Sequence, residues 1–275
     1  MRQPQKTQQR DSSRGAPFAY ILIGLVVLAF AAFLVAGVWQ QRHQVAIDAQ
    51  TLCPKAGPKA LTVILVDATD AMTPVQKASV QARLDATIAK LQQYEAVDVD
   101  SIEPGADLLH PEFRVCRPPS ADETSDWTGN KTLARQQFDD VFKPRLREVL
   151  EKAADRPGSD ASPIMEAIQQ VAVGAFHKAD VAAGKPLPKR LVIVSDMLEN
   201  GAGGSHYKSV PDFATFAQSE AYRRLSAELE GVDVDILYLS RSDAAGVQGE
   251  PHAHFWRQYF SQQHARVRDV FWVEG

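Results

Sequence analysis

The sequence predicts an α/β domain with a doubly wound, mainly parallel sheet and helices on both of its faces, preceded by one transmembrane helix. Three observations predict it. Strand-like and helix-like segments alternate along residues 59–275, two strand-like segments, LTVILVD and RLVIVSD, contain near-continuous apolar runs, and residues 15–41 carry no charge. Apolar strands of this kind are typical of parallel sheets, because helices bury both faces of such a sheet.

The first element is the apolar segment at residues 18–39. It is long enough to cross about 30 Å of hydrocarbon as a helix. Tyr20 and Trp39 lie near its two ends, where aromatic rings favour the membrane interface. A cleaved signal peptide is the alternative, but its apolar region is usually only about 7–15 residues long and ends at small residues. We therefore expect an uncleaved membrane anchor.

The charges around this segment predict its orientation. Four basic residues and one acidic residue precede it, and the side rich in lysine and arginine normally stays in the cytoplasm. Residues 1–17 are then a disordered cytoplasmic tail, since so polar a segment buries too little surface to offset its ordering entropy. Residues 40–58 are a juxtamembrane tether, and residues 59–275 are the periplasmic domain of a single-pass protein of the bacterial inner membrane.

This compartment bears on the two cysteines, Cys53 and Cys116. Thiols outside the cytoplasm oxidise, so we expect the two to form a disulfide. Two unpaired buried thiols are the alternative, because sequence alone does not place the two Cα atoms within bonding distance.

The elements of the domain follow from periodicity. Continuous or alternating apolar residues predict strands, and apolar residues repeated every three or four positions predict helices. The expected strands are residues 61–67, 96–104, 110–118, 190–196, 232–240 and 267–273. The expected helices are residues 74–94, 132–154, 164–176, 211–230 and 252–265. Pro144 should kink or split the second helix, because proline lacks the N–H of a helical hydrogen bond.

Two acids end apolar strands. Asp67 ends the first expected strand and Asp196 ends the fourth. In doubly wound sheets, ligands bind at the carboxyl ends of the strands. We therefore expect the two carboxylates to lie at the same edge of the sheet, where a candidate site is to be sought.

The order of elements and these polar residues together resemble a von Willebrand factor type A (vWA) domain, a Rossmann-like fold, over residues 61–273. That family builds a metal-ion-dependent adhesion site from D-x-S-x-S after the first strand, a Thr or Ser at a later helix start and an Asp that ends the fourth strand. The matching residues are Asp67, Thr69, Ser162 and Asp196, while Ala71 stands where the second Ser is expected.

The resemblance implies a weak Mg²⁺ site, because carboxylates and hydroxyls are the oxygen ligands that Mg²⁺ prefers. Asp70 is a further candidate ligand beside Thr69. A structural interpretation stays open. Ser162 before Pro163 is a typical N-cap, and strand-terminal acids can accept hydrogen bonds from loop amides. The site is then either a functional Mg²⁺ centre or a remnant that holds no metal.

Other candidate residues are weaker. Glu199, Asn200 and Ser205 belong to a glycine-rich loop after Asp196 and could wrap a ligand, although a mobile surface loop is the simpler interpretation. His252 and His254 are expected at a helix start rather than on zinc. Four aromatic residues at helical spacing are expected in the core: Phe255, Trp256, Tyr259 and Phe260.

The function expected from these observations is binding or scaffolding of another envelope protein, not catalysis. The net charge is −4 although the N-terminal tail is basic, which argues against nucleic acid as a partner. The alternative is a membrane-tethered, metal-dependent hydrolase. Asp67 and its neighbours resemble the nucleophile loop of phosphatases of the haloacid dehalogenase class, but Thr69 replaces the expected second acid. No G-x-S-x-G motif is present.

Overall fold

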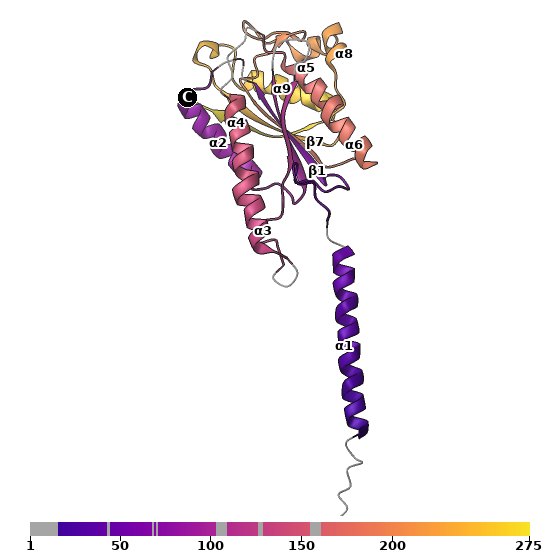
Figure 1. Ribbon diagram of the computed structural model, residues 1–275. Helices are drawn as coiled ribbons and strands as arrows, with labels where there is room; N and C mark the ends of the chain where they lie inside the picture. Colours follow the sequence, from indigo (N-terminus) through magenta and orange to yellow (C-terminus); the bar gives the residue numbers. More distant parts are fainter. Residues whose placement is uncertain are drawn as a thin grey trace, which may run out of the picture. The chain divides into compact units, whose positions relative to one another are not determined.

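The computed structural model describes residues 16–42, 45–67, 69, 71–102, 109–125, 129–154 and 161–275 (Figure 1). Asp70 and most of the predicted N-terminal tail lie outside this part of the chain. The chain divides into two compact units, Met1–Ala46 and Ile47–Gly275.

In the part that the structure describes, the N-terminal unit consists mainly of the helix α1 (Ala16–Arg42), of 27 residues. Its window Tyr20–Gly37 has a mean hydropathy of 2.6, and none of that window is buried. A helix that is apolar on every side is typical of a membrane span when its apolar surface is not buried in a protein core. The predicted helix is therefore confirmed, and it is long and apolar enough to cross a membrane.

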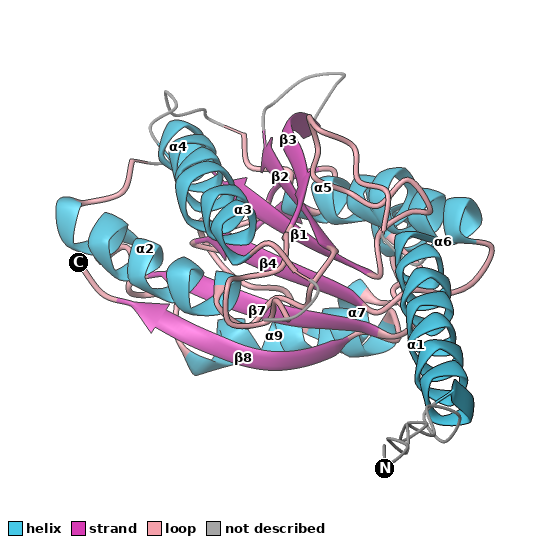
Figure 2. Cartoon of the chain, turned by 60° about the horizontal axis from the view of Figure 1, so that its bottom comes forward, coloured by secondary structure: helices cyan, strands magenta, loops and turns pink. Residues whose placement is uncertain are grey.

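The second unit is built on one six-stranded sheet with the strand order β3-β2-β1-β4-β7-β8 (Figure 2). Only the pair of β2 with β3 is antiparallel, so the sheet is mainly parallel, as predicted. The strands are β1 (Ala60–Asp67), β2 (Glu95–Ile102), β3 (Leu109–Cys116), β4 (Lys189–Ser195), β7 (Val232–Leu239) and β8 (Arg266–Val273).

Helices cover both faces of this sheet, and the alternation along β1 divides the core between them. Leu61, Val63 and Leu65 belong to the core on one face, while Ile64 and Val66 belong to the core on the other. The first face is covered by α5 (Ile164–Val171), α7 (Phe213–Phe216), α8 (Glu220–Leu225) and α9 (Glu250–Gln262). The second face is covered by α2 (Pro74–Ile88) and α4 (Lys143–Ala154), with α3 (Lys131–Arg135) leading into α4. A π-helical turn, Ala172–His177, joins α5 to α6 (Lys178–Ala183), and a short 3-10 helix lies at Ser242–Ala244.

The helix expected to kink or split at Pro144 instead runs on through a π-helical turn. The turn, Gln136–Phe142, joins α3 to α4, and Pro144 is the second residue of α4. The amide of Lys143 donates to Phe138 O, five residues back, which is the wider spacing of a π-helix. The spacing of the backbone hydrogen bonds therefore widens just before Pro144, and the helix continues into α4 without a break.

The helix expected at residues 211–230 is wrong as a single element. Two short helices replace it, because two separate N-caps start new helices. The side chain of Asp212 accepts a hydrogen bond from Thr215 N and starts α7, and that of Ser219 accepts from Tyr222 N and starts α8. The helix expected at residues 74–94 is also shorter than predicted and ends at Ile88.

The predicted disulfide between Cys53 and Cys116 is present, with the two Cα atoms 4.7 Å apart. Cys116 is the last residue of the edge strand β3. Its amide also donates to Thr51 O over 2.8 Å. The segment before β1 is thereby fastened to the edge of the sheet by one covalent bond and one hydrogen bond.

Candidate functional site

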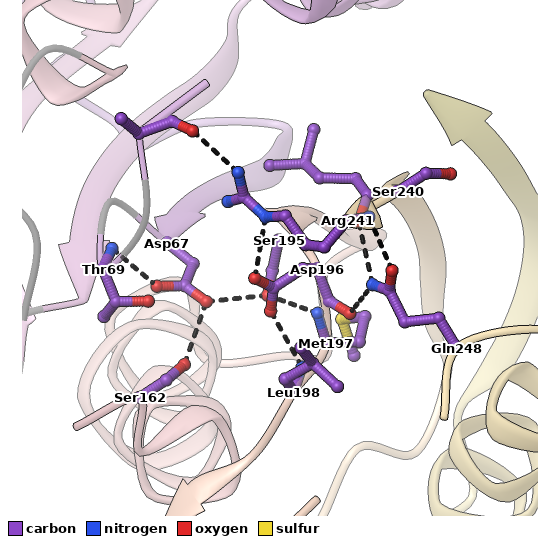
Figure 3. A network of polar contacts seen from close by, with 12 residues as sticks. Asp67, Thr69, Ser162, Ser195, Asp196, Met197, Leu198, Ser240, Arg241 and Gln248 are labelled. Atoms are coloured by element: carbon purple, nitrogen blue, oxygen red, sulfur yellow. Dashed lines mark hydrogen bonds and ion pairs between the residues drawn. The ribbon is translucent and has the colours of Figure 1, made fainter. Parts of the chain in front are cut away.

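The candidate site lies at the carboxyl ends of β1 and β4, which are neighbours in the sheet (Figure 3). Asp67 is the last residue of β1, and Asp196 directly follows β4. Each residue is only 2% exposed. The prediction that the two acids meet at one edge of the sheet is therefore confirmed.

Asp67 is held by three donors. Its Oδ1 accepts a hydrogen bond from Thr69 N at 3.1 Å. Its Oδ2 accepts from Ser162 Oγ at 3.0 Å and from Ser195 Oγ at 2.8 Å. Both oxygens of this buried carboxylate are thus satisfied by the protein, which offsets the cost of burying a charge.

Ser162 does not cap the following helix, so its interpretation as an N-cap is wrong. The residue at the N-cap position of α5 is Pro163, and no side chain at that position bonds the first turn. The hydroxyl of Ser162 donates to Asp67 instead. Ser162 is fixed in place by its backbone, which exchanges two hydrogen bonds with Asn200, of 3.0 and 2.8 Å.

Asp196 is held by one amide and one guanidinium. Its Oδ1 accepts from Leu198 N at 2.9 Å, and its Oδ2 accepts from Arg241 Nε at 3.0 Å. Burial and, after it, the negative charge of Asp67 together raise the pKa of Asp196 to about 7, although the hydrogen bond from Leu198 and the contact with Arg241 act to lower it. Two acids buried close together do not readily carry two charges.

Arg241 is the residue that sequence reasoning missed. It follows the strand β7, and besides Asp196 it bonds Ala71 O through Nη1 at 2.7 Å. Gln248 fixes this segment, because its Oε1 accepts from Arg241 N and its Nε2 donates to the carbonyl oxygens of Asp196 and Leu239. The sequence did contain a signal for Arg241. A charged residue just after a strand that is parallel to β1 and β4 also lies at the carboxyl edge of the sheet.

The described residues do not fit a bound Mg²⁺ well. A resident divalent cation needs oxygen ligands facing an open position. Here the positive guanidinium of Arg241 already lies against Asp196, and Ala71 contributes only a backbone oxygen. Thr69 does supply one buried hydroxyl oxygen that has no hydrogen-bond partner. Within the described part of the chain, no group of three or more His, Cys, Asp or Glu residues is placed to hold a metal ion.

The glycine-rich loop is partly buried, so its interpretation as a surface loop is wrong for Glu199, while Asn200 is half-buried. Two short strands, β5 (Asn200–Gly201) and β6 (Gly204–Ser205), form a hairpin. Glu199 is fully buried, and its Oε2 accepts a hydrogen bond from Met165 N in the first turn of α5 at 2.9 Å. Ser205 lies in β6 and is exposed.

The glycines of the hairpin make room for Glu199. A Cβ added at Gly201 would come within 2.9 Å of Glu199 Oε1, and one at Gly203 within 2.6 Å of Met165 Sδ. Burial raises the pKa of Glu199 to about 8. The loop therefore caps α5 with a buried carboxyl group, a role that Ser162 was expected to fill.

A second buried polar cluster lies beneath the hairpin. His252, in the first turn of α9, contacts His206 Nδ1 at 3.1 Å, Trp256 Nε1 at 3.1 Å and the hydroxyl of Tyr238. Burial lowers the pKa of His206 to about 4 and that of His252 to about 3. His252 is at the helix start, as expected, but buried, whereas His254 is exposed. The four aromatic residues of α9 are buried in the core, as predicted.

Comparisons with known proteins find no protein-family model that matches this chain and no curated protein that matches it.

Proposed function

We propose that this chain is a single-pass membrane protein that presents an extracytoplasmic vWA-like domain, and that the domain binds or scaffolds another envelope protein. The observation that carries the proposal is the position of Asp67 and Asp196. With the six strands of the sheet numbered along the chain, their order is 3-2-1-4-5-6, which reverses between β1 and β4. Ligands of doubly wound sheets bind at this reversal, and the two acids end these two strands.

Two further features support the proposal. The helix α1 has the length and hydropathy of a membrane anchor, and basic residues precede it. The disulfide between Cys53 and Cys116 suits an oxidising compartment outside the cytoplasm. Both favour a domain that is displayed on the outer side of the inner membrane, where its partner is an envelope protein.

The hydrolase alternative is less well supported by the contacts of Asp67. A nucleophilic carboxylate must reach its substrate, but Asp67 is 2% exposed and both of its oxygens accept hydrogen bonds from the protein. Such a mechanism also needs a general acid within hydrogen-bond reach of the leaving group. Thr69, the residue at the expected position, cannot act as one at neutral pH.

Site-specific photo-crosslinking of the full chain in its native membrane tests the proposal. A photoreactive residue at Ala71, which is exposed beside the site, should crosslink a discrete partner. The matched control is Lys185, which is also exposed but precedes β4 and so lies toward the opposite edge of the sheet. The same crosslinked products from both positions, or none from Ala71, would count against binding at this edge.

A phosphatase assay distinguishes the hydrolase alternative from the binding proposal. The full chain in detergent should show no activity above background on a panel of phosphate esters, with or without Mg²⁺. Activity that the substitution Asp67→Asn abolishes would replace the binding proposal with the hydrolase.

A further inference from the structure

Arg241 contacts one of the two acids that the vWA resemblance expects to hold a divalent cation. Its guanidinium contacts Asp196 Oδ2 on one side and Ala71 O on the other, so it bridges the segments that follow β4 and β1 (Figure 3). Ala71 is the position at which the resemblance expects a second hydroxyl ligand. The residue that fails to supply a hydroxyl thus supplies a carbonyl oxygen to Arg241.

The pair of Arg241 and Asp196 is not an ordinary surface ion pair. The side chain of Arg241 is 13% exposed and that of Asp196 is 2% exposed. Charges removed from water to this degree must be compensated, because an unpaired buried charge is strongly destabilising. The two acids at this sheet edge, Asp67 and Asp196, can both be ionised only beside a positive charge, which a metal ion or a guanidinium can provide.

We propose that Arg241 is the built-in cation of this site and replaces the divalent metal ion. Arginine suits the role because its guanidinium keeps its charge at any physiological pH and presents several donors in one plane. The site then keeps the same charge balance in the presence of chelators and across changes in metal supply. Metal binding to the wild type is excluded by repulsion, since Arg241 already neutralises the acid that a metal would need.

The proposal is tested on the full chain purified in detergent, in three forms: wild type, Arg241→Gln and Arg257→Gln. Arg257→Gln is the matched control, because Arg257 forms a more exposed ion pair with Glu250 within α9 rather than with Asp67 or Asp196. Binding is followed through the electron paramagnetic resonance signal of unbound Mn²⁺, and stability through the unfolding temperature with and without millimolar Mg²⁺.

Wild type and Arg257→Gln should leave the Mn²⁺ signal unchanged and unfold at the same temperature with and without Mg²⁺. Arg241→Gln should unfold at a lower temperature without metal, should be restored in part by Mg²⁺ and should deplete the Mn²⁺ signal. Stoichiometric Mn²⁺ binding by the wild type would overturn the proposal. So would a folded Arg241→Gln protein that binds no metal.

If Arg241→Gln does not fold, the double variant Arg241→Gln with Asp196→Asn decides. It removes one negative charge together with the positive one and leaves an oxygen to accept from Leu198 N. Recovery of folding supports Arg241 as the compensating cation, and failure to recover overturns that role. None of these measurements involves a partner, so their outcome is independent of the function proposed above.

Discussion

Glu199 shows at the scale of one residue how burial couples stability to pH. Its carboxyl group is fully buried at the start of α5, and burial raises its pKa from 4.5 to about 8, with the nearby charge of Glu166 adding to the effect. The folded protein therefore holds a proton that the unfolded chain releases above about pH 4.3. Because the folded state binds more protons in this window, this group makes the protein less stable as pH rises from about 4.5 to 8.

We predict that Glu199→Gln removes this loss of stability. The amide oxygen can still accept from Met165 N, but no proton is released. The stability of the variant relative to wild type should grow by about 1.4 kcal/mol per pH unit across the window, which chemical denaturation at several pH values measures. The exposed Glu220, replaced by Gln, is the control for loss of one carboxylate. A difference that does not change with pH would contradict the assignment.

Ser162 gives a second prediction for a single residue. Its hydroxyl bonds a buried carboxylate, and hydrogen bonds to charged groups contribute about 1.5–3 kcal/mol. Thr73 is an ordinary N-cap of α2 with a reciprocal bond to Gln76, and loss of such a cap costs about 1 kcal/mol. We therefore expect Ser162→Ala to lower the unfolding free energy more than Thr73→Ala does. Equal losses in denaturation experiments would mean that Ser162 is no more than a local turn residue.

Part of the site could be predicted from residues alone. The apolar runs indicate parallel strands, so both Asp67 and Asp196 are expected at the carboxyl edge, but the pairing of β1 with β4 is known only from the structure. The contact of Arg241 with Ala71 joins residues 170 positions apart and depends on the rotamer of a long side chain. The direction of the Ser162 hydroxyl depends in the same way on tertiary contacts, because an N-cap and a carboxylate compete for it.

At the scale of elements, local sequence signals predicted whether a segment is a helix or a strand better than they predicted where it begins and ends. β1 and β4 were predictable because near-continuous apolar runs are typical of strands in a sheet that is buried on both faces. The π-helical turn before Pro144 was not predictable, since it changes the spacing of the backbone hydrogen bonds while the apolar residues stay on one face of the helix. The split between α7 and α8 depended on the caps Asp212 and Ser219, which lie inside a segment of continuous helical periodicity.

The disulfide belongs to this scale because it fastens the segment before β1 to the edge strand β3. We predict that alkylation of the unreduced protein labels neither Cys53 nor Cys116 and that mass spectrometry finds them linked. Replacement of both by alanine should cost about 2–4 kcal/mol of stability, since the bond restricts the unfolded chain. Two labelled thiols in native membranes would show that the bond does not form in the cell.

At the scale of the whole molecule, the charge around α1 predicts the orientation of the chain. A reporter enzyme that is active only in the periplasm, fused after Gly275, should be active, because basic residues precede the apolar segment. The matched control is the same reporter fused before α1, which should be inactive. Activity of a cytoplasmic reporter after Gly275 would reverse the orientation and remove the oxidising compartment from the proposed function.

The strand order has a consequence for how the chain is made. β1 lies inside the finished sheet, between β2 and β4. The ribosome synthesises β2 soon after β1, but β4 much later. At about 5–20 residues per second, several seconds separate the two. During that time one side of an apolar strand has no partner, and unpaired strand edges are templates for aggregation. Cys53 and Cys116 both precede β4 in the sequence, so the disulfide can form before the sheet is complete. It can then hold β1, β2 and β3 together until β4 has been synthesised.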